Sequence, residues 1–184
     1  EVLTRYVCEN LKIVPILPNH CPLSKIANLP KIMAAITFQC LPFDQLSLRQ
    51  LYDLLALRID VFIVEQNCPF HDADGKDFYA WHCLGYDNDG VLVAYTRLFD
   101  LNLSFEGFTS IGRVATSNKV RGQGAGRQLM TYSIEQCEKL FGHQPIKIGA
   151  QQYLLTFYES FGFQSTGEDY LEDGIPHTIM IREA

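Results

Sequence analysis

Two long stretches of the sequence repeat apolar residues at the spacing of an α-helix. In the first, Ser47 and Gln50 form an S-x-x-Q capping box, and the apolar stripe that follows continues to about Glu65. In the second, apolar positions recur over residues 129–141, directly before a glycine that can end a helix. The shorter segment YLLTFYESF has the same periodicity. The pattern therefore predicts two long helices and one short helix.

Short apolar runs bounded by Gly, Pro, Asp and Asn predict β-strands. Two of these runs flank the sequence DNDG, whose Asp89-Gly90 pair is a strong signal for a hairpin. The runs cover residues 34–40, 81–86, 91–98, 108–115, 146–150, 163–170 and 175–181. Together with the helices, the order is β-α-β-β-β-α-β-α-β-β. This order predicts an α/β fold with a mixed, mostly antiparallel sheet and one parallel crossover, and it argues against a doubly wound fold.

The chain of 184 residues has the length of one domain, but its first part differs in composition. Residues 1–32 hold four of the eight prolines and no glycine, and the first methionine is Met33. We predict that residues 1–32 are an N-terminal extension and that residues 33–184 form the domain.

The overall charge bears on the kind of partner. The chain has 15 Lys and Arg against 21 Asp and Glu, a net charge of -6, which disfavours nucleic acid and favours a cationic ligand. No apolar run is long enough to span a bilayer, and no signal peptide opens the chain. The sequence therefore predicts a cytoplasmic protein without a membrane partner, and it leaves the oligomeric state open.

The cysteines carry no signature of a metal site or a disulfide framework, because they lie far apart and form no CxxC pair. We interpret them as reduced, mostly buried thiols. They are Cys8, Cys21, Cys40, Cys68, Cys83 and Cys137.

The most informative stretch is IGRVATSNKVRGQGAGRQL, where a predicted strand runs into a glycine-rich turn and then a helix. Such a turn presents free backbone N–H groups and the positive end of the helix dipole to one place, which is an anion site. Glycine allows a phosphate to approach the backbone donors closely. The better-known patterns GxxxxGK[ST] and GxGxxG are absent. The pattern that is present is R-x-x-G-x-G, at Arg121, Gly124 and Gly126.

This R-x-x-G-x-G stretch resembles the acyl-CoA pyrophosphate motif of the GCN5-related N-acetyltransferases (GNAT). The segments LYDLLALRIDVFIVEQNCPF, AQQYLLTFYESFGF and YLEDGIPHTIM are similar to the ElaA-like branch of that superfamily. The family's pattern Y-x-x-x-G-F falls on Tyr158, Gly162 and Phe163. The resemblance covers about residues 33–182 and leaves residues 1–32 unmatched.

The resemblance implies the GNAT (acyl-CoA N-acyltransferase) fold, in which two central parallel strands splay apart and the pantetheine arm of acetyl-CoA pairs with the first of them. It implies that the pyrophosphate binds the glycine-rich turn, and the residue spacing predicts no metal. The implied cofactor-binding residues are Arg113, Val114, Ala115, Arg121, Gly122, Gln123, Gly124, Ala125, Gly126, Arg127 and Gln151.

The implied reaction is direct attack of a primary amine on the thioester, and it needs a proton donor and a proton acceptor. The resemblance puts Tyr158 beside the sulfur as the donor. An amine with a pKa near 10.4 is mostly protonated at pH 7, so a proton acceptor is useful. Glu65, at the end of the first long helix, is our first choice. The other candidates are His82, Glu172, Asp173 and His177.

The loop EQNCPFHDADGKD raises the question of calcium, but its glycine stands at the fourth position from the first Asp and not at the sixth, where an EF-hand requires it. Turn formation explains Asp72, Asp74 and Asp77 more simply. If the loop lines the acceptor groove, its carboxylates favour a polyamine, an amino-sugar or a lysine-like acceptor.

Three other functions stay open at this stage. The LR-x-x-VF pattern followed by an acidic loop also occurs in acyl-homoserine-lactone synthases, although the R-x-x-G-x-G loop argues against that activity. A non-catalytic acyl-CoA-binding module would keep the glycine-rich turn without proton-handling groups. Nucleic-acid binding is disfavoured by the net charge.

Overall fold

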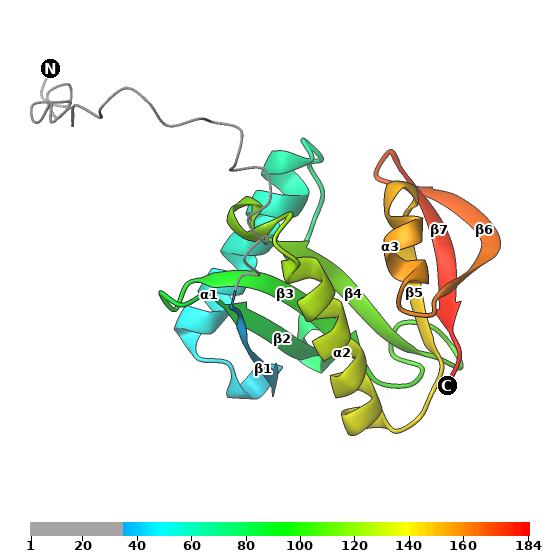
Figure 1. Cartoon of the computed structure of the whole chain (residues 1–184), viewed down its shortest axis with the longest axis horizontal. Coiled ribbons are helices and arrows are strands. Elements are labelled where there is room, and N and C mark those ends of the chain that lie inside the picture. Colours follow the sequence, from blue (N-terminus) through cyan, green and yellow to red (C-terminus); the bar gives the residue numbers. More distant parts are fainter. Residues whose placement is uncertain (1–34) are drawn as a thin grey trace, which may run out of the picture. The chain divides into compact units, whose positions relative to one another are not determined.

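A computed structural model describes residues 35–184 of the chain (Figure 1). Its helices and strands follow in the predicted order. The strands are β1 (Thr37–Pro42), β2 (Trp81–Tyr86), β3 (Leu92–Phe99), β4 (Thr109–Thr116), β5 (Ile146–Gln151), β6 (Gln164–Glu172) and β7 (Ile175–Arg182); the helices are α1 (Leu48–Arg58), α2 (Ala125–Phe141) and α3 (Leu155–Glu159). No helix of this part of the chain is long and apolar enough to cross a membrane.

The short sequence motifs adopt the local structures that they predict. Ser47 Oγ accepts a hydrogen bond from the Gln50 N–H while Gln50 Oε1 accepts one from the Ser47 N–H, so the capping box is complete. The helix that begins there changes to a π-helix over Ile59–Glu65, so its extent is as predicted but its second half has a wider turn. In the β2–β3 hairpin, Gly90 has a φ of 75°.

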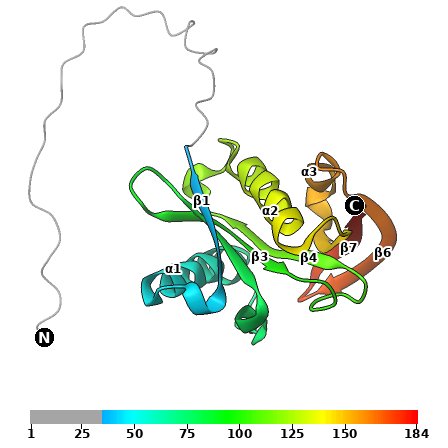
Figure 2. The ribbon, with the colours of Figure 1, turned by 90° about the horizontal axis from the view of Figure 1, so that it is seen from below.

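The seven strands form one sheet in the order β1-β2-β3-β4-β5-β7-β6. Every neighbouring pair is antiparallel except β4 and β5. As Figure 2 shows, α1 lies on one face of the sheet and α2 on the other. The mixed, mostly antiparallel sheet with one parallel crossover is therefore confirmed.

The central strands separate soon after they meet. The parallel pairing of β4 with β5 consists of Thr109 with Ile146 and Ser110 with Lys147, and beyond this point the two strands diverge (Figure 1). A β-bulge in β4 increases the bend, since two of its residues, Arg113 and Val114, lie opposite one residue of β3. Beyond these pairs no backbone pairing joins β4 to β5, and we call this divergence of the two strands the opening.

Apolar side chains cover both faces of the sheet. Leu54, Leu57 and Val61 pack on Leu84 and Tyr95 on the α1 side. On the other face, the buried side chains of α2 and α3 pack on β3, β4, β5 and β7; this cluster includes Leu98, Ile111, Met130, Ile134, Cys137, Ile146, Ile148, Tyr158, Phe163 and Met180. Cys68, Cys83 and Cys137 are buried free thiols and Cys40 is a half-buried one, whereas Cys8, Cys21 and the predicted extension 1–32 lie outside the described residues.

Candidate active site

The glycine-rich turn connects β4 to the N-terminus of α2. Gly122 and Gly124 have φ values of 70° and 83°, a conformation that favours glycine, and Gly124 is the residue directly before the helix. No side chain of the described part of the chain caps this helix start. Because the first N–H groups of a helix have no partner within it, those of residues 125–127 are available to an anion. The side chain of Gln123 donates a hydrogen bond to the Lys119 carbonyl, at 2.8 Å.

The two arginines of the turn brace it. Arg121 donates to the Thr116 carbonyl through Nε and Nη2, at 2.9 and 2.7 Å, and its Nη1 contacts the Glu65 carboxylate. It thereby links the end of β4 to the end of the π-helix. Arg127 donates to Ser160 Oγ at 2.9 Å and lies over the ring of Phe161, which joins the first turn of α2 to the end of α3. Both arginines make these contacts through their side chains, so they do not occupy the backbone N–H groups of the turn.

The bulge in β4 carries the strand residues predicted to bind the cofactor. Arg113 has a φ of 52°, which is uncommon for a residue other than glycine. Its side chain does not point along the opening, because Nε donates to Asp72 Oδ1 at 2.8 Å and the guanidinium stacks on Phe70. The backbone of Arg113, Val114 and Ala115 borders the divergence of β4 and β5. Across the opening, Gln151 Nε2 at the end of β5 donates to Gln66 Oε1 at 3.2 Å.

Tyr158 lies on α3, on the α2 side of the sheet, and is only 5% exposed. Its ring makes edge-on contacts with Phe157 and Phe163. Burial raises the pKa of its hydroxyl above the usual value, with a further contribution from Tyr153. Within residues 35–184 the hydroxyl makes no hydrogen bond, so it can donate one to a bound molecule.

The candidate proton acceptors lie in different surroundings. The Glu65 carboxylate is the one that contacts Arg121. His82 is fully buried on β2 and uses both ring nitrogens, at 2.7 Å from Tyr95 Oη and 3.1 Å from the Asp77 carbonyl. Burial lowers the pKa of His82. Since both nitrogens are occupied within the fold, His82 is a structural residue.

The remaining candidates lie together on the β6–β7 hairpin. His177 Nδ1 is 2.8 Å from the Ile175 carbonyl, and its Nε2 is 3.9 Å from Glu172 Oε2. Asp173 forms the turn with a φ of 48°, and its carbonyl accepts from Cys68 Sγ at 3.5 Å. The structure thus brings Glu172 and His177 together and separates them from His82.

The three loop aspartates are neutralised by arginines. Asp72 and Asp77 accept hydrogen bonds from the buried Arg58 at 2.7 and 2.8 Å, and Arg97 bonds to both Asp74 and Asp77. Arg113 completes this network through Asp72. These carboxylates therefore have little uncompensated charge for a cationic acceptor, because each already pairs with an arginine. Among the described residues, no group of three or more His, Cys, Asp or Glu side chains could hold a metal ion.

Sequence reasoning missed the role of Arg58 and Arg97 in this network. Arg58 stands within an apolar helical stripe and Arg97 within the strand-like run VLVAYTRL. An arginine at a position that the pattern assigns to the core is itself a signal, because it requires buried carboxylates as partners.

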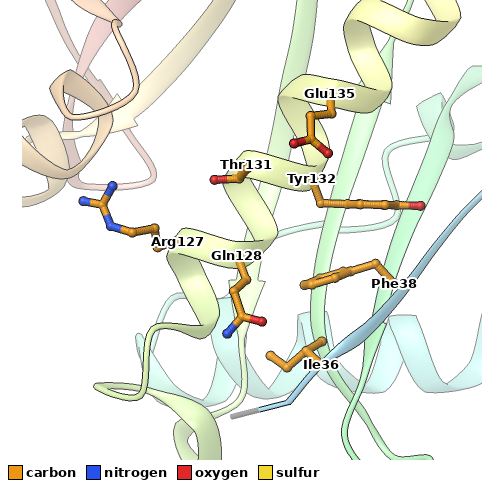
Figure 3. Close-up of a pocket in the computed structure, with 7 residues that line it drawn as sticks. All are labelled: Ile36, Phe38, Arg127, Gln128, Thr131, Tyr132 and Glu135. Atoms are coloured by element: carbon orange, nitrogen blue, oxygen red, sulfur yellow. The ribbon is translucent and has the colours of Figure 1, made fainter. Parts of the chain in front are cut away.

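A separate groove of about 400 Å³ lies between β1 and the outer face of α2 (Figure 3). The rings of Phe38 and Tyr132 stack there at 4.9 Å. Arg127 is the one predicted site residue that lines this groove, and Tyr158 and the bulge of β4 do not. It is therefore distinct from the opening between β4 and β5.

The comparisons with known proteins agree with this arrangement. Residues 77–184 match the family described as acetyltransferase (GNAT) domain. Protein ElaA of Escherichia coli strain K12 is 47% identical over 150 residues, which are 80% of this chain and 97% of that protein. The crystal structure of ElaA matches with a TM-score of 0.75 at 46% identity, over 81% of this chain and 100% of that one.

A second solved structure is equally similar in fold. The crystal structure of an acyl-CoA N-acyltransferase from Pseudomonas aeruginosa matches with a TM-score of 0.75 at 41% identity, over 80% of this chain and 99% of that one. The chain is similar to ElaA, belongs to the GNAT acetyltransferase family and has the acyl-CoA N-acyltransferase fold.

Proposed function

We propose that this protein is an acetyl-CoA-dependent N-acetyltransferase that transfers an acetyl group to a primary amine of a cationic acceptor by direct attack. The observation that carries the proposal is the presence of three features in one domain: the uncapped start of α2, the opening between β4 and β5, and the Tyr158 hydroxyl, which makes no hydrogen bond within the described residues. The similarity to the acyl-CoA N-acyltransferase of Pseudomonas aeruginosa supports it. A cytoplasmic location stays a prediction.

The cofactor would lie along the route that these features define. Backbone N–H groups of residues 125–127 would bind the pyrophosphate, with Arg121 and Arg127 holding the turn in shape. The backbone of Arg113, Val114 and Ala115 is left without a full partner strand where β5 diverges, so the pantetheine arm can pair with it as an added strand. Gln151 would face the arm from β5.

The chemical step needs one bond to form and one to break. The amine nitrogen attacks the thioester carbonyl, the C–S bond breaks, and the departing thiolate receives a hydrogen bond from the Tyr158 hydroxyl. A raised phenol pKa makes complete proton transfer to a thiolate unfavourable. Tyr158 therefore contributes mainly by hydrogen bonding.

Glu65 is the predicted acceptor of the proton that the amine loses. One of its carboxylate oxygens contacts Arg121, so Glu65 is held by the same residue that fixes the glycine-rich turn to the end of β4. The other oxygen is free to accept from an amine, because a carboxylate has several lone pairs.

Calorimetry with acetyl-CoA, combined with a thiol-release screen over primary amines, tests the function. We expect acetyl-CoA to bind and at least one amine to release the thiol. Binding without thiol release from any amine would indicate a non-catalytic acyl-CoA-binding module. Formation of an acyl-homoserine lactone from S-adenosylmethionine and an acylated carrier would indicate the other enzymatic activity.

A further inference from the structure

The β6–β7 hairpin carries an acidic segment that, unlike the loop 72–77, has no arginine or lysine partner among residues 35–184. Its carboxylates are Glu168, Asp169, Glu172 and Asp173. The one ion-pair contact of these groups within the described residues is between Glu172 and His177. The hairpin thus keeps its negative charge at the surface, whereas Asp72, Asp74 and Asp77 do not.

His177 has one ring nitrogen bonded and the other not. The residue is 8% exposed, and its ring stacks on Tyr170 with a centroid distance of 5.4 Å. Nδ1 lies 2.8 Å from the Ile175 carbonyl, which can only accept, so Nδ1 carries a proton. In the neutral ring, Nε2 is therefore a lone-pair acceptor.

Nε2 faces a second acceptor. Glu172 Oε2 is 3.9 Å away, beyond hydrogen-bond distance, and the same oxygen is 3.5 Å from Tyr170 Oη. Burial raises the pKa of Tyr170 to about 12, with a contribution from Glu172, so its hydroxyl keeps its proton at neutral pH. This contact is satisfied either by a proton on Nε2 or, with the ring neutral, by a donor that bonds to both atoms. A primary ammonium, with three N–H donors, satisfies both.

The position of this cluster connects it to the acceptor side of the opening. His177 is the cross-strand partner of Gln151 on β5 and of Tyr170 on β6. Gln151 contacts Gln66, the residue next to Glu65. Tyr170 Oη lies against Gly149 so closely that a Cβ there would come within 2.1 Å of it. The cluster therefore lies beside β5, whose Gln151 contacts the segment that carries Glu65.

We propose that Glu172, His177 and Tyr170 form a binding site for an ammonium group of the acceptor other than the one that reacts. The acceptor is thus a diamine or a lysine-like molecule, with one amine at Glu65 and the other between Glu172 and His177. This inference rests on the proposed acetyltransferase function for the identity of the ligand as an acceptor. The binding of a diamine is measurable without turnover.

The first experiment is an NMR titration of the full chain with 1,4-diaminobutane in the absence of acetyl-CoA. The imidazole signal of His177 is assigned by its loss in His177→Gln. In the wild type we expect the His177 signal to shift and saturate with the diamine, and the same shift to require roughly 10- to 100-fold more butylamine. In Glu172→Gln the diamine should shift the signal no more effectively than butylamine does. Glu106→Gln, which removes an exposed carboxylate in another loop, should behave as the wild type.

The second experiment measures KM and kcat with 1,4-diaminobutane, butylamine and 4-aminobutanoate as acceptors. The wild type should prefer them in that order, through KM, and Glu172→Lys should reverse the order while the affinity for acetyl-CoA stays the same. An unmoved His177 signal with the diamine, or an unchanged order of acceptors in Glu172→Lys, would overturn the proposal. If the diamine moves the His177 signal but no amine releases the thiol, the cation site stands and the acetyltransferase function fails.

Discussion

Arg58 is a fully buried cation in the middle of an apolar helix face. Its guanidinium donates to Asp72 and Asp77, and the same Asp77 oxygen accepts from Arg97. Such a network ties α1, the loop 66–80 and β3 together, and through Arg113 it reaches the bulge of β4. The loop therefore holds the bulge of β4, the strand that borders the opening, through the contact between Asp72 and Arg113.

Removing one carboxylate charge from this network should destabilise the protein strongly. Asp77→Asn keeps the shape but leaves Arg58 and Arg97 with less compensating charge, and losses of about 3–5 kcal/mol are typical for a buried pair with one partner removed. The free energy of unfolding in urea measures the effect. Asp53→Asn, which removes an exposed i,i+4 pair with Arg49, should cost less than about 1 kcal/mol. Equal losses in the two variants would contradict this account.

The network also predicts loss of stability in acid. Burial alone would raise the pKa values of Asp74 and Asp77, but hydrogen bonds and charge outweigh it and lower both. At Asp74 they come from Arg97 and the Lys76 N–H, and at Asp77 from Arg58 and Arg97. A carboxylate with a lowered pKa in the folded state stabilises the fold above its unfolded pKa, near 3.9, and loses this contribution as the pH falls towards its folded pKa. Urea denaturation should thus give a steady free energy of unfolding above about pH 5 and a falling one below about pH 4. Asp77→Asn should show a smaller decrease.

Tyr158 is the residue whose catalytic role is simplest to separate from packing. Tyr158→Phe keeps the buried ring and removes a hydroxyl that makes no hydrogen bond within the described part of the protein. Stability and acetyl-CoA affinity should stay the same, while kcat for amine acetylation falls by about 10²-fold, the lower end of general acid assistance. Tyr153→Phe, in the same segment but 75% exposed, is the matched control. A wild-type rate in Tyr158→Phe, with chemistry rate-limiting, would make Tyr158 a packing residue.

At the scale of elements, sequence patterns predicted what depends on neighbouring residues. The Ser47–Gln50 capping box, the Asp89-Gly90 hairpin and the glycine-rich start of α2 each need only a few consecutive residues, and each is present. The change to a π-helix after Arg58 was not predictable in this way, since its causes lie in the fold. The bulge at Arg113 was missed for the same reason: in the sequence, residues 108–115 form an uninterrupted strand pattern.

The start of α2 is the element on which cofactor binding depends most directly. Gly124→Val introduces a branched side chain at a φ of 83°, where it disfavours the backbone conformation and intrudes on the N–H donors. Calorimetry should show that acetyl-CoA affinity is lost while the fold is kept. Gly107→Val is the control, because Gly107 has a φ of 80° in a distant loop and nothing within 4 Å of an added Cβ. Equal acetyl-CoA affinity in the two variants would place the cofactor elsewhere.

At the scale of the whole molecule, the candidate site combines residues that are far apart in the chain. Arg121 contacts Glu65, and Gln151 contacts Gln66, across 56 and 85 positions of the sequence. The resemblance to GNAT proteins predicted the turn, Tyr158 and Glu65 because each belongs to a local motif. It did not predict the Arg58 network or the facing acceptors of Glu172 and His177, because these depend on which side chains the sheet brings together.

The extent of the domain gives a prediction for the intact chain. A version that begins at Met33 should fold, bind acetyl-CoA and acetylate amines as the full chain does, because the family match begins beyond this point and the described strands and helices begin at Thr37. Circular dichroism compares the fold of the two proteins, calorimetry their affinity for acetyl-CoA, and thiol release their activity. Insoluble or inactive protein from Met33 onward would show that residues 1–32 contribute to the domain.

The short contact between β4 and β5 also bears on how the chain reaches its fold. Only two residue pairs join the β1–β4 half of the sheet to the half formed by β5, β7 and β6, and each half is built from consecutive stretches of chain. The first half, with α1 and α2, is synthesised before β5. It can therefore bury much of its own core early, and the C-terminal strands then dock on α2 as a second cooperative unit.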